Sequence, residues 1–270
     1  MSQEVDAFRR DGVVVIRDAV DPDTLARLAA GVEHNRRHPS RWAHWYTDRA
    51  NAVGFWSDYV TWPDVEHYRT VVFESPLAAL AGRLMGSGTV RFFHEHVLVK
   101  EPGATEHTPW HHDQPYYCVD GDQNVSMWIP LDPVPATSVM RFIAGSHRWG
   151  RWFVPRRFVD HVPYSASDGR FETVPDLDAE LDAHRVLSFD VEPGDLIAFH
   201  YRTLHDAPGN ELATRRRAVS LRWLGGDATF ATRPWQVSPP YDAEGLDVGG
   251  PLDDDPRFPL IVSGGEAHPT

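Results

Sequence analysis

The chain has 270 residues, 41% of them hydrophobic and 24% charged, which is enough to bury a substantial core. Its 26 basic residues against 39 acidic ones give a formal charge of −13, which argues against nucleic acid as a partner. The single cysteine, Cys118, excludes an intrachain disulfide and a cysteine-based zinc site. No apolar run is long enough to span a bilayer and the charged N-terminus does not resemble a signal peptide, so we expect a cytoplasmic protein with no membrane partner.

The sequence of the first third of the chain predicts mainly helices. "SQEVDAFRRDG" predicts a short helix that ends at Gly12, and "VVVIRD" predicts a strand after it. In "DPDTLARLAAGVEHNRR", Asp21 can cap a helix and Pro22 suits its first position. "SPLAALAGRLMG" repeats this logic and ends at Gly86. Each helix has one apolar face, so both should pack on a flat surface.

From residue 89 the chain changes to short segments in which polar and apolar residues alternate. These segments are "TVRFFHEHVLVK", "NVSMWIPLD", "SVMRFIAG", "HRVLSFDV", "DLIAFHYRTLH" and "RRAVSLRWLG". Many short strands without helices between them predict an antiparallel sandwich or barrel. We find no repeat or linker and expect one domain over 1–270: a helical part at 1–88, a β core at 89–225 with a lid insertion at about 148–186, and a C-terminal wrap at 226–270.

The stretch "TPWHHDQPYY" raises the question of which histidine would bind a metal. In an extended strand alternate side chains share a face, so His111 and Asp113 point one way and His112 the other. A His-x-Asp pair alone is weak, because fifteen histidines in an Asp-rich chain should give roughly one by chance. "EPGDLIAFHYRTLHDAPGN" adds His200 and His205, and two histidines with one carboxylate form the facial triad of non-haem Fe(II) oxygenases. His205 is a candidate third ligand.

An arginine in the next segment suits a dicarboxylate. "RRRAVS" places Arg216 in a strand that could run antiparallel to the strand of His200. The planar guanidinium group pairs with a carboxylate through two parallel hydrogen bonds, so Arg216 fits the distal carboxylate of a 2-oxoacid.

The segments "WHHDQPYY", "RFIAGSHRWG", "EPGDLIAFHYRTLH" and "RRAVSLRW", in this order, resemble the phytanoyl-CoA dioxygenase family of Fe(II)/2-oxoglutarate-dependent oxygenases. The opening "FRRDGVVVIRDAVDPDTLARL" and the late "LDDDPRFPLIV" resemble it too, so the likeness covers nearly the whole chain. It implies a mainly β fold with flanking helices: a double-stranded β-helix (jelly roll, cupin-like) with N-terminal helices packed on one sheet.

The resemblance also implies roles for individual residues. Arg216 matches the arginine for the C5 carboxylate of 2-oxoglutarate, Trp128 falls where an aromatic often lies beside this cosubstrate, and Lys100 is a looser match. "ATSVM" and "AGSH" depart from the usual "NG"-type turn and "PGSH", which should change the shape of loops rather than the chemistry. The positions that match the iron ligands are His111, Asp113 and His205.

The activity that the resemblance implies is that of a dioxygenase, which uses Fe(II), 2-oxoglutarate and O2 to hydroxylate a small organic molecule and releases succinate and CO2. Halogenating relatives replace the carboxylate ligand with a small residue, so Asp113 favours hydroxylation. Desaturation, epoxidation and cyclisation remain alternatives. A cupin-like metalloenzyme without O2 chemistry and a non-catalytic binding protein are rival classes. We expect a monomer or a small homo-oligomer.

Other conspicuous residues also have a plain structural interpretation. We expect His200 to be a packed strand residue, while His94 and His96 share a strand face and line either a pocket or the core. Four arginines form either a solvated face or a grip on an anionic substrate: Arg148, Arg151, Arg156 and Arg157. An aromatic cluster before the β core is either core or substrate contact: Trp42, Trp45, Tyr46, Phe55, Trp56, Tyr59 and Trp62.

Overall fold

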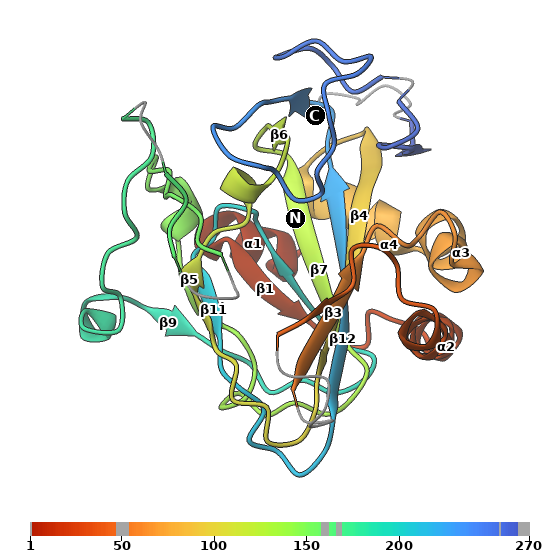
Figure 1. Cartoon of the computed structure of the whole chain (residues 1–270), viewed down its shortest axis with the longest axis vertical. Helices are drawn as coiled ribbons and strands as arrows, with labels where there is room; N and C mark the ends of the chain where they lie inside the picture. The colour runs from red at the N-terminus through yellow and green to blue at the C-terminus, as the bar shows by residue number, and fades with distance from the viewer. Residues whose placement is uncertain (1, 47–53, 158–161, 166–168, 254, 264–270) are drawn as a thin grey trace.

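The computed structural model describes residues 2–46, 54–157, 162–165, 169–253 and 255–263. Within these ranges one large antiparallel sheet, the major sheet, dominates the fold (Figure 1). Its strands, in spatial order, are β1 (Val13–Ile16), β10 (Leu196–Phe199), β7 (Asn124–Pro130), β12 (Arg216–Leu224), β4 (Val90–Lys100), β3 (Phe55–Tyr59) and β2 (His44–Trp45), with β14 (Leu260–Val262) beside the start of β4.

A second antiparallel sheet, the minor sheet, packs against the major one. Its strands, in spatial order, are β5 (Thr108–His111), β11 (His205–Ala207), β8 (Arg141–Ile143) and β9 (Val186–Leu187). Buried side chains from both sheets meet in one cluster, for example Phe142 of β8 with Phe199 of β10. The described residues therefore have the predicted architecture, a mainly β double-stranded β-helix with helices on one sheet.

The helices begin and end where local signals dictate. In α1 (Gln3–Asp11) the Ser2 side chain accepts a hydrogen bond from the Val5 N–H, and Gly12 ends the helix at φ 74°. Gly12 is also constrained by packing, because a Cβ there would lie 2.3 Å from the His147 ring. Asp21 caps α2 (Pro22–Arg37) in the same way, by accepting from the Thr24 N–H.

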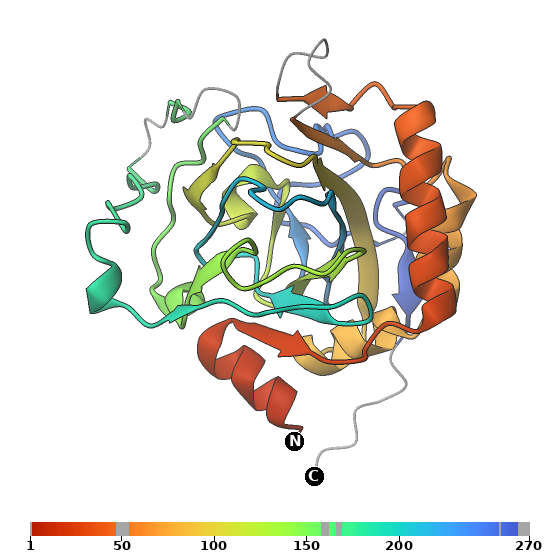
Figure 2. The same ribbon diagram turned by 90° about the horizontal axis from the view of Figure 1, so that it is seen from below.

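Two further helices complete the outer layer. The helix α4 (Leu77–Met85) ends at Gly86 as predicted, whereas the helix before it, α3 (Glu66–Glu74), was not singled out by the sequence. Figure 2 shows α2 along the outside of the major sheet and α1 beside β1. Apolar side chains of α2, α3 and α4 pack on Val97, Val99, Val219 and Leu221, which lie on the outer face of the sheet.

The inner face of the major sheet carries different residues. Along β12, Ala218 lies opposite Leu98, Ser220 opposite His96, and Arg222 opposite His94. Opposed residues of paired strands share a face, so polar side chains from β4 and β12 gather on the side turned toward the minor sheet. This face forms the floor of a cavity between the two sheets.

The long connection between β8 and β9 packs outside the minor sheet. Its described part contains isolated bridges, such as Phe153 to Glu172, and a single-turn 3-10 helix at Leu181–Ala183. Phe153, Val174 and Leu177 are buried against Trp110 and other residues of the minor sheet. Near the C-terminus, β13 (Thr229–Phe230) pairs with β6 (Val119–Asp120).

The structure divides the aromatic cluster near the N-terminus. Phe55 and its neighbours form β3 inside the major sheet, so this segment belongs to the β core rather than preceding it. Trp56 and Trp62 lie in the outer core, while Tyr46 stacks on Phe55 with ring centroids 4.4 Å apart and faces the cavity. Among the described residues, no helix combines the length and apolar character needed to cross a membrane.

Candidate metal and cosubstrate site

His111 and His205 are direct neighbours on paired strands. They face each other in the register of β5 and β11, and their ring centroids lie 4.2 Å apart. The Nδ1 of His111 lies 2.8 Å from the Pro109 carbonyl oxygen, and the Nδ1 of His205 lies 2.9 Å from the Thr203 carbonyl oxygen. A carbonyl can only accept, so each neutral ring is protonated at Nδ1 and presents the lone pair of Nε2. This is the tautomer that a metal-binding histidine needs.

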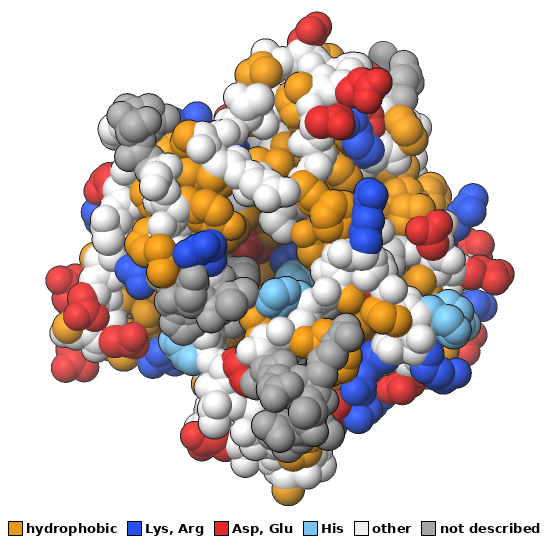
Figure 3. All heavy atoms as spheres, viewed as in Figure 1, with side chains coloured by type: hydrophobic (Ala, Val, Ile, Leu, Met, Phe, Trp, Pro, Cys, Tyr) orange, Lys and Arg blue, Asp and Glu red, His pale blue; other side chains and the backbone are white. Residues whose placement is uncertain are grey.

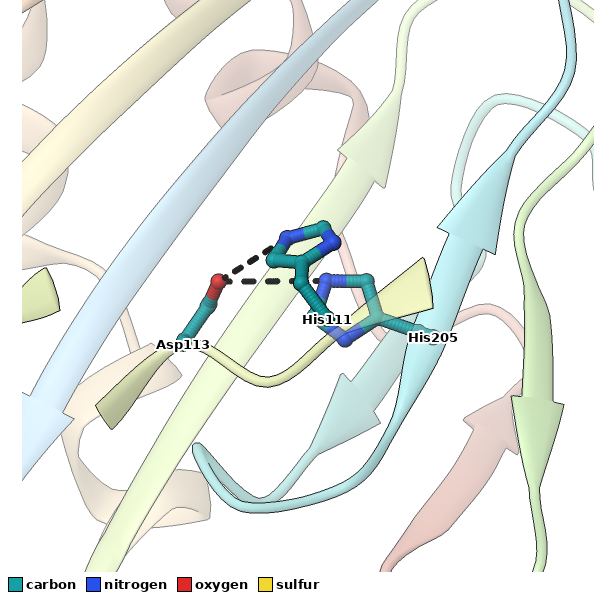
Figure 4. A group of neighbouring side chains, drawn as sticks. All are labelled: His111, Asp113 and His205. Atoms are coloured by element: carbon teal, nitrogen blue, oxygen red, sulfur yellow. Dashed lines mark ion pairs between the residues drawn. The ribbon is translucent and has the colours of Figure 1, made fainter. Parts of the chain in front are cut away.

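Asp113 completes the cluster shown in Figure 4. Its Oδ1 lies 3.5 Å from the Nε2 of His111 and 3.8 Å from the Nε2 of His205, and a set of ligand atoms from the three buried residues lies within 4.8 Å. Two nitrogen donors and one carboxylate, arranged around a common point, fit a divalent iron of the facial-triad type.

Strand alternation, on which the sequence-based pairing of His111 with Asp113 rested, is not what brings the two together. β5 ends at His111, and Asp113 has a helical backbone conformation (φ −73°, ψ −38°) at the start of a 3-10 turn, so that reasoning was wrong. What positions Asp113 is its backbone N–H, which donates to the Tyr201 carbonyl at 2.7 Å. The turn brings the carboxylate back toward the histidines.

Charged neighbours keep Asp113 ionised although it is buried. Burial alone would raise the pKa of this carboxyl group, but its contact with the His111 ring and the positive charge of Arg222 lower it well below its usual range. Burial lowers the pKa of His205 to about 4. An anionic carboxylate and a neutral imidazole are the forms that bind a metal ion.

The other two histidines of the motifs lie outside the cluster. His112 turns away, and its Nε2 accepts a hydrogen bond from the Phe153 N–H at 3.0 Å, which ties the long connection to β5. His200 follows β10; its Nδ1 accepts from the Arg202 N–H, and its Nε2 donates to the Asp122 carbonyl. Both are buried residues with a structural role.

A cavity leads from the three-residue cluster to Arg216. One part of it is lined by His111, Asp113 and His205, the other by Arg216 and Lys100. The two parts share six lining residues: Phe55, Leu98, Thr108, Trp128, Met140 and Ala207. Figure 3 shows the molecular face hollowed near its centre, with a histidine at the rim and charged side chains at the floor.

Arg216 and Lys100 form the basic end of the cavity. They lie opposite each other in the register of β12 and β4. Arg216 is buried and donates to the carbonyl oxygens of Ser138 and Pro208, and Lys100 donates to those of Glu106 and Pro208. Burial lowers the pKa of Arg216 to about 10, and burial with the nearby Arg216 charge lowers the pKa of Lys100 to about 6.

The strand of Arg216 lies elsewhere in the sheet than the sequence suggested. β12 pairs with β7 and β4, and β7 separates it from β10, the strand that precedes His200. Both β10 and β12 are antiparallel to β7, so they run parallel to each other. Trp128 on β7 lies between them, opposite Ser220 and Ile197, and forms part of the cavity wall.

Arg222 is a site residue that sequence reasoning missed. Its Nη2 lies 3.7 Å from the Oδ2 of Asp113, and Ser126 Oγ lies 3.4 Å from the same oxygen. The Nε of Arg222 donates a hydrogen bond to the hydroxyl of Tyr117. The signal was present in "RRAVSLRW": Arg222 has the same parity along the strand as Arg216, so the two had to share a face.

The remaining candidate residues from the sequence lie in the cavity wall, in the core or on the protein surface. His96 lines the cavity, while His94 is buried beside Tyr117. Arg148 donates to the Arg10 carbonyl, and Arg151 pairs with Glu172 on the surface. Neither of these two arginines lines the cavity.

Comparisons with known proteins give the family from one family model and the fold from solved structures. The family model "Phytanoyl-CoA dioxygenase (PhyH)" matches residues 8–218. The carbocyclase SnoK from nogalamycin biosynthesis, described as non-heme and alpha ketoglutarate dependent, superposes with a TM-score of 0.74 at 22% identity, over 97% of each chain. The epimerase SnoN, crystallised with Fe3+, alpha ketoglutarate and nogalamycin RO, gives 0.73 at 24% identity, over 96% of this chain and 97% of SnoN.

A hydroxylated ligand occurs in a third structure. EctD from S. alaskensis, solved with 2-oxoglutarate and 5-hydroxyectoine, superposes with a TM-score of 0.64 at 21% identity, over 93% of this chain and 85% of EctD. At these identities the three structures establish the fold. No curated protein sequence matches the chain.

Proposed function

This chain belongs to the phytanoyl-CoA dioxygenase family of Fe(II)- and 2-oxoglutarate-dependent oxygenases, and on that premise we propose that it hydroxylates a small organic molecule at the cluster of His111, Asp113 and His205. The balanced reaction consumes a substrate C–H bond, 2-oxoglutarate and O2, and it gives the C–OH product, succinate and CO2. The observation that carries the proposal is a pair of adjoining cavity parts, one lined by the three-residue cluster and the other by Arg216, which share six wall residues.

The cluster would hold the iron on one side and leave positions open toward the cavity. The Nε2 atoms of both histidines and the Oδ1 of Asp113 would be the ligands, because these atoms converge while the opposite sides of both imidazole rings are tied to the protein. When bound, the ferrous ion supplies the O2 chemistry, which is coupled to oxidative decarboxylation of 2-oxoglutarate. The carboxylate of Asp113 would occupy the position that halogenation requires for chloride, and this supports hydroxylation.

The far end of the cavity would hold the second carboxylate of 2-oxoglutarate. Arg216 offers a planar donor pair in a buried position, and Lys100 lies opposite it in the strand register. Apolar Leu98 and Ala218 lie between these cations and the metal cluster, which suits the two methylene groups of the cosubstrate. Trp128 lines the side of the cavity and would limit the access of water.

A succinate-release assay with a panel of small organic molecules tests this function. The purified protein should release succinate in a way that depends on Fe(II), 2-oxoglutarate and O2, and the product should gain one oxygen atom by mass spectrometry. A loss of two hydrogens instead would indicate desaturation or ring closure. Turnover that survives Arg216→Ala, or that proceeds without O2, would show a metalloenzyme of another class.

A further inference from the structure

We propose that Arg222 and Ser220 form a second anion-binding point in the active-site cavity, which binds a negatively charged oxygen of the organic substrate. The inference rests on the proposed function and assigns its substrate class: an acidic organic molecule that carries a carboxylate, phenolate or enolate oxygen. Arg216 would bind the cosubstrate at one end of the cavity, and Arg222 would bind the substrate at the other.

The first observation is the position of Arg222. It follows Arg216 by six residues on the same face of β12, about 20 Å further along the strand. The part of the cavity near Arg216 contains no residue of the metal cluster, whereas the part near Arg222 contains all three. 2-Oxoglutarate must extend from the cluster toward Arg216, so Arg222 lies on the side of the cluster left to the substrate.

The second observation is a pair of buried polar atoms. The side chain of Arg222 is 8% exposed, and its Nε and Nη2 are directed to Tyr117 and Asp113. Its Nη1 has no hydrogen-bond partner among the described residues, and neither has the Oγ of Ser220. Both residues line the cavity that contains the metal cluster. Buried donors without partners are rare in folded proteins, so an acceptor from a ligand is the expected complement.

The third observation is the balance of charge. Among the described residues that line the cavity, Asp113 is the single acid, against the guanidinium groups of Arg216 and Arg222. A ferrous ion, the dianion of 2-oxoglutarate, Asp113 and Arg216 cancel one another. Lys100 lies at the Arg216 end, and with its pKa lowered to about 6 by burial it carries little charge at neutral pH. Arg222 is left as a buried cation without a full counter-charge, and an anionic substrate would supply one.

Aromatic side chains in the part of the cavity that contains the metal cluster suit the carbon skeleton of such a substrate. Tyr46 and Phe55 stack face to face and line the same part of the cavity as Phe199 and Trp128. His96, opposite Ser220 in the strand register, adds a polar edge. The oxyanion would be held at Arg222 while the apolar remainder lies against the aromatic wall.

Chloride is a probe that needs no knowledge of the substrate. The protein would be loaded with zinc, as a diamagnetic substitute for iron, and with saturating 2-oxoglutarate, so that Arg216 is occupied. Exchange of chloride at the anion-binding point should then broaden the chloride NMR line. Arg222→Met should remove most of this additional line width. Arg217→Met, on the outer face of the same strand, is the matched control and should leave the broadening unchanged.

Two further variants protect the test against a misfolded Arg222→Met protein. Ser220→Ala removes one hydrogen bond and should weaken chloride binding by about 2- to 10-fold. Arg222→Lys retains the charge and should retain part of the broadening. Equal line widths for the wild type, Arg222→Met and Ser220→Ala would overturn the proposal.

Parallel anaerobic titrations with Fe(II) and 2-oxoglutarate separate this inference from the proposed function. No charge-transfer band in the wild type would contradict the proposed function itself. A band in wild type and variants, without any difference in chloride binding, would contradict the anion-binding point alone. Weaker 2-oxoglutarate binding in Arg222→Met at unchanged chloride broadening would assign Arg222 to the cosubstrate and overturn the proposal.

Discussion

The two faces of β4 and β12 differ sharply although their residues alternate along the same chain. The outer face presents Val97, Val99, Val219 and Leu221 to the helices, and these four side chains are fully buried. The inner face presents mainly polar and charged side chains, among them His96, Lys100, Arg216, Ser220 and Arg222. The comparison indicates that the outer face stabilises the fold. The inner face carries polar groups whose burial lowers the stability of the fold and which are available for binding. Substitutions on the two faces should therefore separate stability from function.

The largest expected effect comes from the metal cluster itself. His205→Ala removes one of three ligands, so iron affinity should fall by on the order of 10²-fold or more, beyond the 10–100-fold typical of residues that only support a ligand. Succinate release should disappear while the thermal unfolding midpoint of the metal-free protein changes little. Fe(II) titration and calorimetry measure both. Unaltered iron affinity would remove His205 from the site.

A matched pair of neighbours on β12 tests the difference between the faces directly. Leu221→Ala leaves a cavity in the outer core and should lower the free energy of unfolding by about 2–5 kcal/mol. Ser220→Ala, one residue away on the inner face, should change it by less than about 0.5 kcal/mol, because its hydroxyl has no partner among the described residues. Urea unfolding of the metal-free protein measures both changes. Similar losses for the two variants would refute the assignment of the faces.

Arg216 and Arg217 provide a second matched pair, with a smaller effect. Arg216→Met removes the charge-assisted hydrogen bonds to the cosubstrate, worth about 1.5–3 kcal/mol, and should raise the KM for 2-oxoglutarate by about 10- to 100-fold. Arg217 pairs with Asp132 on the outer side, so Arg217→Met should leave this KM unchanged. Steady-state kinetics at varied 2-oxoglutarate concentration measure this KM in both variants. An equal rise of the KM in both would count against the role of Arg216.

The last expected effect is a gradual pH dependence of stability that arises on the outer face. Burial raises the pKa of Glu95 to about 7, although Thr61 and Trp62 donate hydrogen bonds to its carboxylate. A raised pKa means that the folded state holds the proton longer, so this contribution is complete below about pH 4.5 and is lost as the pH rises through 7. The slope is at most about 1.4 kcal/mol per pH unit.

Glu95→Gln should remove this part of the pH dependence. Urea unfolding of the wild type and the variant between pH 4.5 and 7.5 gives the comparison. If the difference in unfolding free energy between them stays constant over this range, Glu95 does not titrate there and the assignment is wrong.

The parts of the fold that the sequence predicted are those governed by local chemistry. The caps at Asp21, Gly12 and Gly86 fix helix ends through neighbouring residues, and they are found as predicted. The long alternating segments that became β4, β7 and β12 also have nearly the predicted limits. β3 was not predicted, because the assignment of Phe55–Tyr59 to a strand depends on pairing with the distant β4.

In the site, too, the sequence predicted features that depend on neighbouring residues and missed those that depend on contacts between residues remote in the chain. His111, Asp113 and His205 are brought together as the family resemblance implied, but the conformation of Asp113 depends on a hydrogen bond to Tyr201, which no local pattern reveals. Arg222 was missed because its importance comes from Asp113 and Tyr117, both remote in sequence. The roles of these residues in iron and cosubstrate binding stay predictions until they are measured.

The most direct test of the central claim is an anaerobic optical titration of the purified protein with Fe(II) and 2-oxoglutarate. We expect a weak visible charge-transfer band that appears only when both are present, that is lost in His205→Ala, and that requires more 2-oxoglutarate in Arg216→Met. Absence of the band in the wild-type protein, or its persistence without change in both variants, would contradict the assignment of this cavity as the iron and 2-oxoglutarate site.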